Sequence, residues 1–239
     1  MRPVVYSTEG PWGNLWPWFV KATGCEHYPA SGGLRPGVGI MWGILRGIPA
    51  LITASIVANR PWVYLDHGYF NRGHYSGHYR MTWCDFQQRG VIERPADRWE
   101  ALGVTLEPWK RGRNVVVCPP SDLILKLYGI PDWTRETVAA IKQKTDRPVV
   151  IQTKGQPFDE ALRDAHCVVT VSSVAAVEAV SKGVPVFVSE ISAAAPVGRV
   201  DLEIESPVYP EREPWARSLA YGQFTKEEWG RGWEVVNRS

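Results

Sequence analysis

Two adjacent serines and one glutamate in the second half of the chain are of the residue types that hold a phosphorylated ligand. Ser172 and Ser173 stand where the apolar run Cys167–Val171 gives way to helical spacing. A helix start offers unpaired backbone N–H groups and a positive dipole end, and serine hydroxyls donate to phosphate oxygens. Glu178 lies in an otherwise apolar segment, where its carboxylate needs partners such as the two hydroxyls of a ribose. The pattern predicts a nucleotide site, and a plain helix cap with a solvent-exposed glutamate is the alternative.

Two further residues follow predicted strands of the same half. Ser121 comes after Asn114–Cys118, and Lys154 comes after Pro148–Gln152. Ligands of parallel sheets bind at the carboxyl ends of the strands, so both residues are candidates for the same site. Lys154 is either a point charge for a phosphate or an ordinary exposed lysine. Ser121 either caps the next helix or contacts the ligand.

An acidic and a basic residue at the end of a predicted strand in the first half suggest proton transfer. Asp66 and His67 directly follow the apolar run Trp62–Leu65. A carboxylate or imidazole at a strand end can act as general base on an acceptor hydroxyl. A polar loop with a structural role is the alternative.

The segment after this pair is rich in histidine, aromatic residues and arginine. Four of its residues are candidate contacts to an acceptor or to phosphate: Arg72, His74, His78 and Arg80. Arginine forms bidentate hydrogen bonds with anions, which favours this interpretation. Three histidines with six and three intervening residues on a glycine-rich loop match no strong zinc pattern, so no metal site is predicted.

Alternating strand and helix patterns must position these residues. In the second half, apolar strands of four or five residues alternate with helical segments, which indicates parallel sheets covered by helices on both faces. In the first half the alternation is less regular, and the Gly/Pro-rich stretch Pro29–Gly39 reads as a loop. We expect an α/β protein with two Rossmann-like lobes and a C-terminal helical tail. The expected domains are residues 1–110, residues 111–205, and a tail 206–239 that packs back on the first lobe, helical over Trp215–Trp233.

The segment VVTVSSVAAVEAVSKGVPVFV, Val168–Val188, carries a family resemblance. Its pattern of strand, paired serines, glutamate, glycine and Pro-Val resembles the donor-binding lobe of GT-B glycosyltransferases. It is closest to the capsule-polysaccharide and Kdo-transferase-like branch and to small glycosyltransferase-like proteins of bacteriophages. The similarity covers Asn114–Glu190 and, more loosely, the tail segment SLAYGQFTKEEW. The usual enzymes are longer, which implies a minimal acceptor lobe, and epimerases of the same fold share much of the motif.

The resemblance implies roles for Ser172, Ser173 and Glu178. The serine-bearing turn, Ser172 and Ser173 here, would hold the donor pyrophosphate, and Glu178 would hold the ribose. The expected activity is transfer of a sugar from a nucleotide sugar, a UDP-sugar by analogy, to a hydroxyl acceptor. The bacteriophage resemblance suggests hydroxymethyl-pyrimidine in DNA as the acceptor, and a glycan is the other candidate. A nucleotide-sugar epimerase and a non-catalytic nucleotide-binding module are the competing functions.

Composition and the absence of certain motifs narrow the functional classes to which the protein could belong. The net charge of +2 is too small to indicate nucleic-acid binding by bulk charge. The four cysteines form no CxxC pair, and no apolar run approaches the length of a membrane span, so we expect a cytoplasmic protein with no membrane partner, in the host cytoplasm if it is encoded by a phage. Neither a GxxxxGK[ST] nor a strand-linked GxGxxG motif occurs, which disfavours ATPases of that class and dinucleotide oxidoreductases. No permanently bound cofactor is expected.

Overall fold

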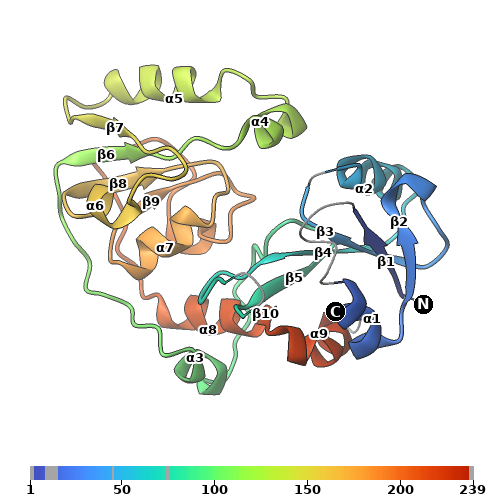
Figure 1. Cartoon of the computed structure of the whole chain (residues 1–239). Coiled ribbons are helices and arrows are strands. Elements are labelled where there is room, and N and C mark those ends of the chain that lie inside the picture. The colour runs from blue at the N-terminus through green and yellow to red at the C-terminus, as the bar shows by residue number, and fades with distance from the viewer. Residues whose placement is uncertain (1–2, 9–15, 45, 74–75, 237–239) are drawn as a thin grey trace. The chain divides into compact units, whose positions relative to one another are not determined.

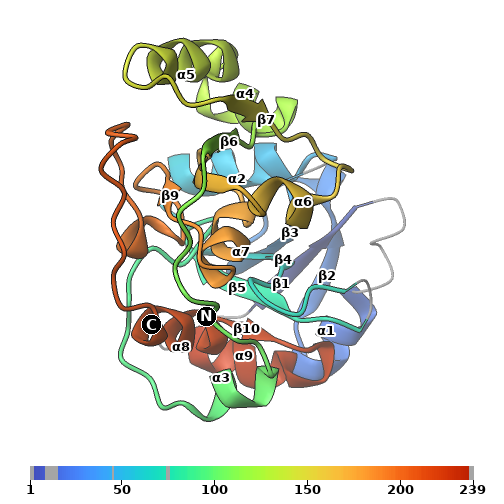
Figure 2. The same ribbon diagram turned by 90° about the vertical axis from the view of Figure 1, so that its left-hand side faces the viewer.

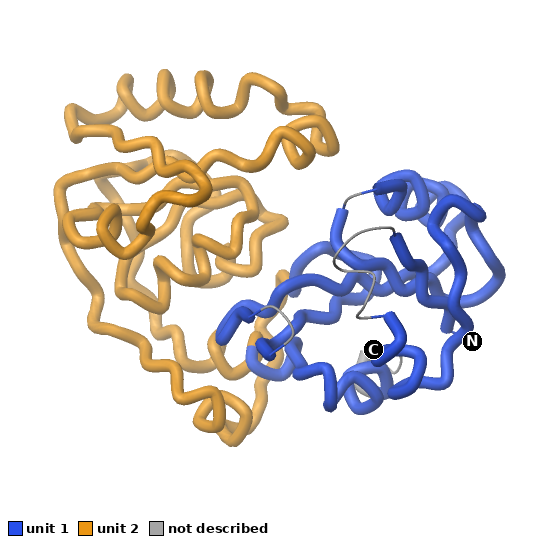
Figure 3. The backbone as a smooth tube through the Cα atoms, viewed as in Figure 1, with its two compact units in different colours: residues 1–88, 220–239 blue, residues 89–219 orange. Residues whose placement is uncertain are grey.

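The chain folds into two compact α/β units. The computed structural model describes residues 3–8, 16–44, 46–73 and 76–236. Unit 1 comprises residues 1–88 and 220–239, and unit 2 comprises residues 89–219 (Figure 3). These boundaries differ from the expected 1–110, 111–205 and 206–239. Residues 107–110 belong to unit 2 because Glu107 N bonds to Ser181 O at 2.8 Å and Lys110 N bonds to Gly183 O at 2.6 Å.

Unit 1 contains a six-stranded sheet in the order β10-β5-β4-β3-β1-β2. Its strands are β1 (Pro3–Ser7), β2 (Glu26–Pro29), β3 (Val38–Trp42), β4 (Trp62–His67), β5 (Tyr79–Trp83) and β10 (Gln223–Phe224). Strands β1 to β4 are parallel, whereas β5 runs antiparallel to β4, and β10 antiparallel to β5. The segment 68–78 is shorter than the dozen or so residues that a parallel crossover needs, so β5 returns beside β4 as the second strand of a hairpin.

Helices cover both faces of this sheet. They are α1 (Trp16–Thr23), α2 (Ile48–Val57) and α9 (Trp229–Val236), with 3₁₀ turns at Ala30–Gly32 and Lys226–Glu228. The α1 and α9 helices lie side by side on one face, where Phe19 and Trp229 pack on strand residues such as Val5 (Figures 1 and 2). The α2 helix covers the other face, where Ile48 packs near Tyr6. Phe224 and Trp229 of the tail segment thus lie in the core of unit 1.

Unit 2 contains a four-stranded parallel sheet in the order β7-β6-β8-β9. Its strands are β6 (Asn114–Val117), β7 (Val149–Ile151), β8 (Ala165–Val169) and β9 (Val186–Phe187). Its helices are α3 (Asp97–Leu102), α4 (Asp122–Tyr128), α5 (Trp133–Lys142), α6 (Phe158–Leu162) and α7 (Ala175–Ser181), with a 3₁₀ turn at Ala195–Val197, and α8 (Glu213–Tyr221) runs from unit 2 into unit 1. The central β6 and β8 strands are buried on both faces, as continuous apolar runs require.

The sequence predicted most of these elements to within a few residues and missed three features. The stretch expected as a loop, Pro29–Gly39, contributes the end of β2, a 3₁₀ turn and the start of β3. The α3 and α4 helices were not predicted. The expected tail helix Trp215–Trp233 is interrupted, because Gln223 and Phe224 pair with β5 as β10. Within the described residues, no helix has both the length and the apolar character needed to cross a membrane.

Candidate functional site

The carboxyl edge of the unit 2 sheet contains a topological switch point. From the central β6, the chain places β7 on one side and then β8 and β9 on the other, so its direction reverses between β6 and β8. The ends of these two strands are joined by a buried hydrogen bond, in which Thr170 Oγ1 donates to the carbonyl oxygen of Cys118 at 2.7 Å. In open α/β sheets ligands bind outside the carboxyl ends of the strands at such a point.

The predicted serine pair lies directly after β8 at this edge. Ser172 and Ser173 are half-buried, and α7 begins at Ala175, two residues later than expected. Ser173 Oγ accepts a hydrogen bond from Ala175 N at 3.2 Å. The Ser173 hydroxyl therefore supports the first turn of the helix and still has a proton to donate.

Glu178 is the half-buried residue in a helix whose other central residues are buried. Burial and, to a smaller extent, the negative charge of Glu178 raise the pKa of the Cys118 thiol to about 12. Glu178 lies on α7, the helix that directly follows the serine-bearing turn. The structure thus gathers Ser172, Ser173 and Glu178 around the switch point of unit 2.

The two other predicted residues of this unit lie on exposed turns. Ser121 is the N-cap residue of α4, as one interpretation expected, although its hydroxyl makes no capping hydrogen bond. Lys154 lies in the turn after β7, where Thr153 N donates to Gln156 Oε1 at 3.0 Å and Gly155 has φ +97°. Among the described residues, Lys154 forms no ion pair.

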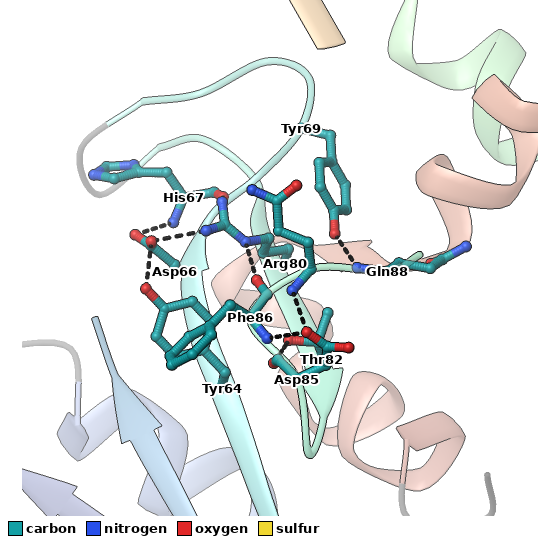
Figure 4. Close-up of polar contacts among 10 residues, drawn as sticks. Tyr64, Asp66, His67, Tyr69, Arg80, Thr82, Asp85, Phe86 and Gln88 are labelled. Carbon is teal, nitrogen blue, oxygen red and sulfur yellow. Dashed lines mark hydrogen bonds and ion pairs between the residues drawn. The ribbon is translucent and has the colours of Figure 1, made fainter. Parts of the chain in front are cut away.

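In unit 1, Asp66 lies at the end of β4 and accepts three hydrogen bonds (Figure 4). Tyr64 Oη and Arg80 Nη2 both donate to Asp66 Oδ2, at 2.8 and 2.9 Å. The backbone N–H of His67 donates to Asp66 Oδ1 at 2.8 Å. The Asp66 side chain keeps 28% exposure, so the carboxylate is fixed in position and still reachable from solvent.

Arg80 was expected to contact an acceptor or a phosphate, and the structure shows it in a different setting. Its side chain is only 7% exposed. Besides Asp66, the guanidinium donates to His67 O at 2.7 Å and to Phe86 O at 3.2 Å. Burial lowers the pKa of Arg80, but the Asp66 carboxylate, Tyr64 and Tyr69 together outweigh it and raise the pKa. Arg80 is therefore the buried cation that holds Asp66 in place.

The remaining predicted residues of unit 1 lie around this pair. The His67 ring packs edge-on to Trp42, with 6.4 Å between the ring centroids, and stacks beside Tyr79, with 6.2 Å between the ring centroids. His78 closes the loop base, since its carbonyl accepts from Gly68 N at 2.8 Å. Arg72 is exposed on that loop. His74 lies outside the described residues.

Sequence reasoning missed three residues that shape these sites. Tyr64 precedes Asp66 by two positions on the same strand, so strand periodicity places both on one face and could have found it. Thr170 and Gln223 carry no local signal, because their partners are 52 and more than 150 residues away. In the part of the chain that the structure describes, no three His, Cys, Asp or Glu residues gather as a metal-ligand group.

Part of unit 2 is similar to a known protein family. Residues 134–190, which include Ser172, Ser173 and Glu178, match the model of a family described as "Putative glycosyltransferase (DUF6716)". No curated protein matches the sequence.

Two solved structures share the fold. The β Kdo 2,4 transferase of Thermosulfurimonas dismutans KpsC aligns with a TM-score of 0.54 and 14% identity, over 90% of this chain and 89% of that one. The β Kdo 2,7 transferase of the same protein aligns with a TM-score of 0.56 and 11% identity, over 100% of this chain and 99% of that one. The chain has the two-lobed α/β fold of these transferases. The resemblance to bacteriophage proteins stays a prediction.

Proposed function

We propose that this protein transfers a sugar from a nucleotide sugar to a hydroxyl acceptor. The observation that supports this most directly is the gathering of Ser172, Ser173 and Glu178 at the switch point of unit 2. These residues fall within the segment that matches the glycosyltransferase family model. The same edge of an α/β sheet is where nucleotide ligands bind in folds of this class.

Unit 2 would bind the donor. The hydroxyls of Ser172 and Ser173 would donate to the diphosphate oxygens, and the Glu178 carboxylate would accept from the two ribose hydroxyls. Lys154, exposed and without an ion pair among the described residues, would add a positive charge for the phosphates. Ser121, whose hydroxyl is not used as a cap, is the further donor contact at the end of β6.

Unit 1 would supply the base for the acceptor hydroxyl. Asp66 Oδ2 already accepts from Tyr64 and Arg80, whereas among the described residues Asp66 Oδ1 accepts from the His67 backbone alone. Since each carboxylate oxygen accepts about two hydrogen bonds, Oδ1 is the atom with capacity for the acceptor proton. The imidazole of His67 is the second candidate at the same strand end. Arg72, His74 and His78 would contact the acceptor, with Arg80 assigned to positioning Asp66.

The donor would be a co-substrate and not a resident cofactor. A UDP-sugar is the donor that the sequence resemblance suggests, and the names of the two structural neighbours add Kdo as a candidate sugar. Hydroxymethyl-pyrimidine DNA and a glycan are the acceptors to compare. The small net charge means that a DNA acceptor would depend on local contacts such as Arg72.

The test begins with donor binding. Thermal shifts of the purified protein are measured against nucleoside phosphates, UDP-sugars and a nucleotide-activated Kdo, with the variants Glu178→Ala and Glu136→Ala in parallel. Glu136 is an exposed glutamate on α5 of the same unit and serves as the control. We expect one nucleotide class to raise the melting temperature of the wild type and of Glu136→Ala, but not of Glu178→Ala. A shift that survives Glu178→Ala would remove the ribose role, and no shift at all would contradict the donor site.

Product analysis then separates the possible activities. With the donor identified, the protein is incubated with it alone, with hydroxymethyl-pyrimidine DNA, and with a glycan acceptor. Sugar transfer requires an acceptor, whereas an epimerase converts the donor without one. A protein that binds the donor and converts it under none of these conditions would contradict the transferase proposal.

A further inference from the structure

The loop that follows Asp66 and His67 is attached to the C-terminal segment through one buried side chain. Gln223 of β10 has no exposed surface. Its Oε1 accepts from the backbone N–H groups of Tyr69 and Phe70 at 2.8 and 2.9 Å, and its Nε2 donates to Phe70 O at 3.4 Å. An amide buried in this way is stable only when its polar atoms are paired, so the side chain and the loop determine each other's position.

The loop leaves no space for a different arrangement at this contact. Gly68 N donates to His78 O at 2.8 Å, which closes the base of the loop. A Cβ atom on Gly68 would lie 2.8 Å from His78 O and 2.9 Å from Gln223 Oε1. The backbone therefore approaches the Gln223 amide as closely as atomic radii allow, and only glycine fits there.

Gln223 also stands in one row with the residues of the proposed base. The strand registers pair Asp66 with Arg80 and Arg80 with Gln223, across β4, β5 and β10. Arg80 holds the Asp66 carboxylate and the His67 carbonyl, while Gln223 holds the next two peptide groups of the loop. Arg80 on β5 and Gln223 on β10 thus together hold residues 66–70 in place through side-chain hydrogen bonds.

We infer that Gln223 is a positioning residue for the acceptor-side site, and that strand β10 of the C-terminal segment is a component of that site. The inference rests on the proposed function for the role of Asp66, whereas the attachment of the loop is independent of it. Loss of the Gln223 amide would release residues 69–73, which carry Arg72, and would leave unit 2 and its nucleotide site unchanged. Transfer would fall while donor binding persists.

The experiment compares Gln223→Met, Gln223→Glu and Phe224→Leu in the full chain. Methionine keeps the volume of the side chain but cannot accept a hydrogen bond from the loop. Glutamate keeps a carbonyl oxygen for Tyr69 and Phe70, and in its protonated form it also donates to Phe70 O. Phe224 is buried in the same strand and bonds to none of the loop amides through its side chain, so Phe224→Leu controls for a general loosening of β10.

Hydrogen exchange of residues 68–73 is measured for each variant, together with the nucleotide-induced thermal shift and, once an acceptor is known, the transfer rate. We expect exchange at Tyr69 and Phe70 to rise about tenfold or more in Gln223→Met, and to stay near the wild-type rate in Gln223→Glu and Phe224→Leu. The nucleotide shift should be equal in all of them. Unchanged exchange in Gln223→Met, or equal exchange in Gln223→Met and Phe224→Leu, would overturn the inference. Absence of transfer in the wild type would instead count against the proposed function alone.

Discussion

Arg80 Nη2 lies 2.9 Å from Asp66 Oδ2, and the two residues are direct cross-strand partners on β5 and β4. A guanidinium that is 7% exposed must be paired, because an isolated buried charge is costly. Here the charge is balanced by Asp66 and by two backbone carbonyls. The pair makes the end of β4 rigid while the carboxylate keeps an edge toward solvent, which is the arrangement that a positioned base requires.

Removing the cation should therefore cost stability as well as activity. For Arg80→Met we expect a loss of about 2 to 3 kcal/mol in the free energy of unfolding, somewhat below the value for a fully buried pair because Asp66 is partly hydrated. Urea unfolding measures the loss. The control is Arg135→Met, which removes an exposed arginine paired with Asp132 on the surface and should change stability by at most about 0.5 kcal/mol. Equal losses in the two variants would show that the Arg80 pair is no stronger than a surface contact.

Replacing the carboxylate by an amide should separate chemistry from binding. Asp66→Asn keeps the shape of the side chain and an oxygen for the Tyr64 hydroxyl, but it cannot take a proton from an acceptor. We expect the transfer rate to fall about 100-fold or more, the usual contribution of a general base, with the nucleotide-induced thermal shift retained. Asp85→Asn, in the neighbouring loop, keeps an oxygen for the Phe86 N–H and should leave the rate unchanged. Full turnover by Asp66→Asn would assign the base elsewhere, with His67 the next residue to test.

The fold of unit 2 could be predicted because its strands are short, valine-rich runs, of which the central β6 and β8 are buried on both faces. Such runs, separated by helical segments, leave few alternatives to a parallel sheet. The placement of the serine pair and Glu178 directly after one strand could be predicted for the same reason, since it requires no knowledge of distant contacts. The pairing of Arg80 with Asp66 could not be predicted, because it depends on the hairpin register that places the two residues opposite each other.

The C-terminal segment shows more clearly what the local sequence cannot predict. Residues 215–233 have helical composition, and nothing in the local sequence indicates that Gln223 and Phe224 form a strand. Their conformation is determined by strand pairing with Arg80 and Tyr79 and by the hydrogen bonds that Gln223 accepts from the backbone N–H groups of the loop. Tertiary contacts over more than 150 residues override local propensity here, as they do generally for short edge strands.

The buried Tyr69 makes stability depend on pH in the alkaline range. Burial raises the pKa of Tyr69 from 10.0 to about 12, because the charged form is poorly solvated there. Its contribution to stability is therefore complete below pH 10 and is lost as the pH rises toward 12. Tyr69→Phe should unfold with a shallower decline of stability above pH 10 than the wild type.

Two other effects on stability must be distinguished from the ionisation of Tyr69. At neutral pH, Tyr69→Phe should be less stable by about 1 kcal/mol, since the N–H of Gln88 loses its acceptor at 2.7 Å. Part of the alkaline decline should remain, because burial also raises the pKa of Cys118 and Cys167 to about 12. Urea unfolding at several pH values measures the decline in stability. An identical decline in the wild type and the variant would mean that folding does not raise the pKa of Tyr69.

Gly183, the glycine in the segment Val168–Val188 that carries the serine pair and Glu178, should be the least replaceable residue of that segment. It follows α7 with φ +73°, and a Cβ atom there would lie 2.0 Å from the carbonyl oxygen of Pro108. Gly129 follows α4 with φ +67° and has open space around it. Alanine at Gly129 should cost about 1 kcal/mol for the backbone conformation alone. Alanine at Gly183 adds a collision with backbone, so we expect about 3 kcal/mol or more by urea unfolding. A loss no larger than that of Gly129→Ala would show that residues 107–108 can move away from α7, and that the glycine serves the turn only.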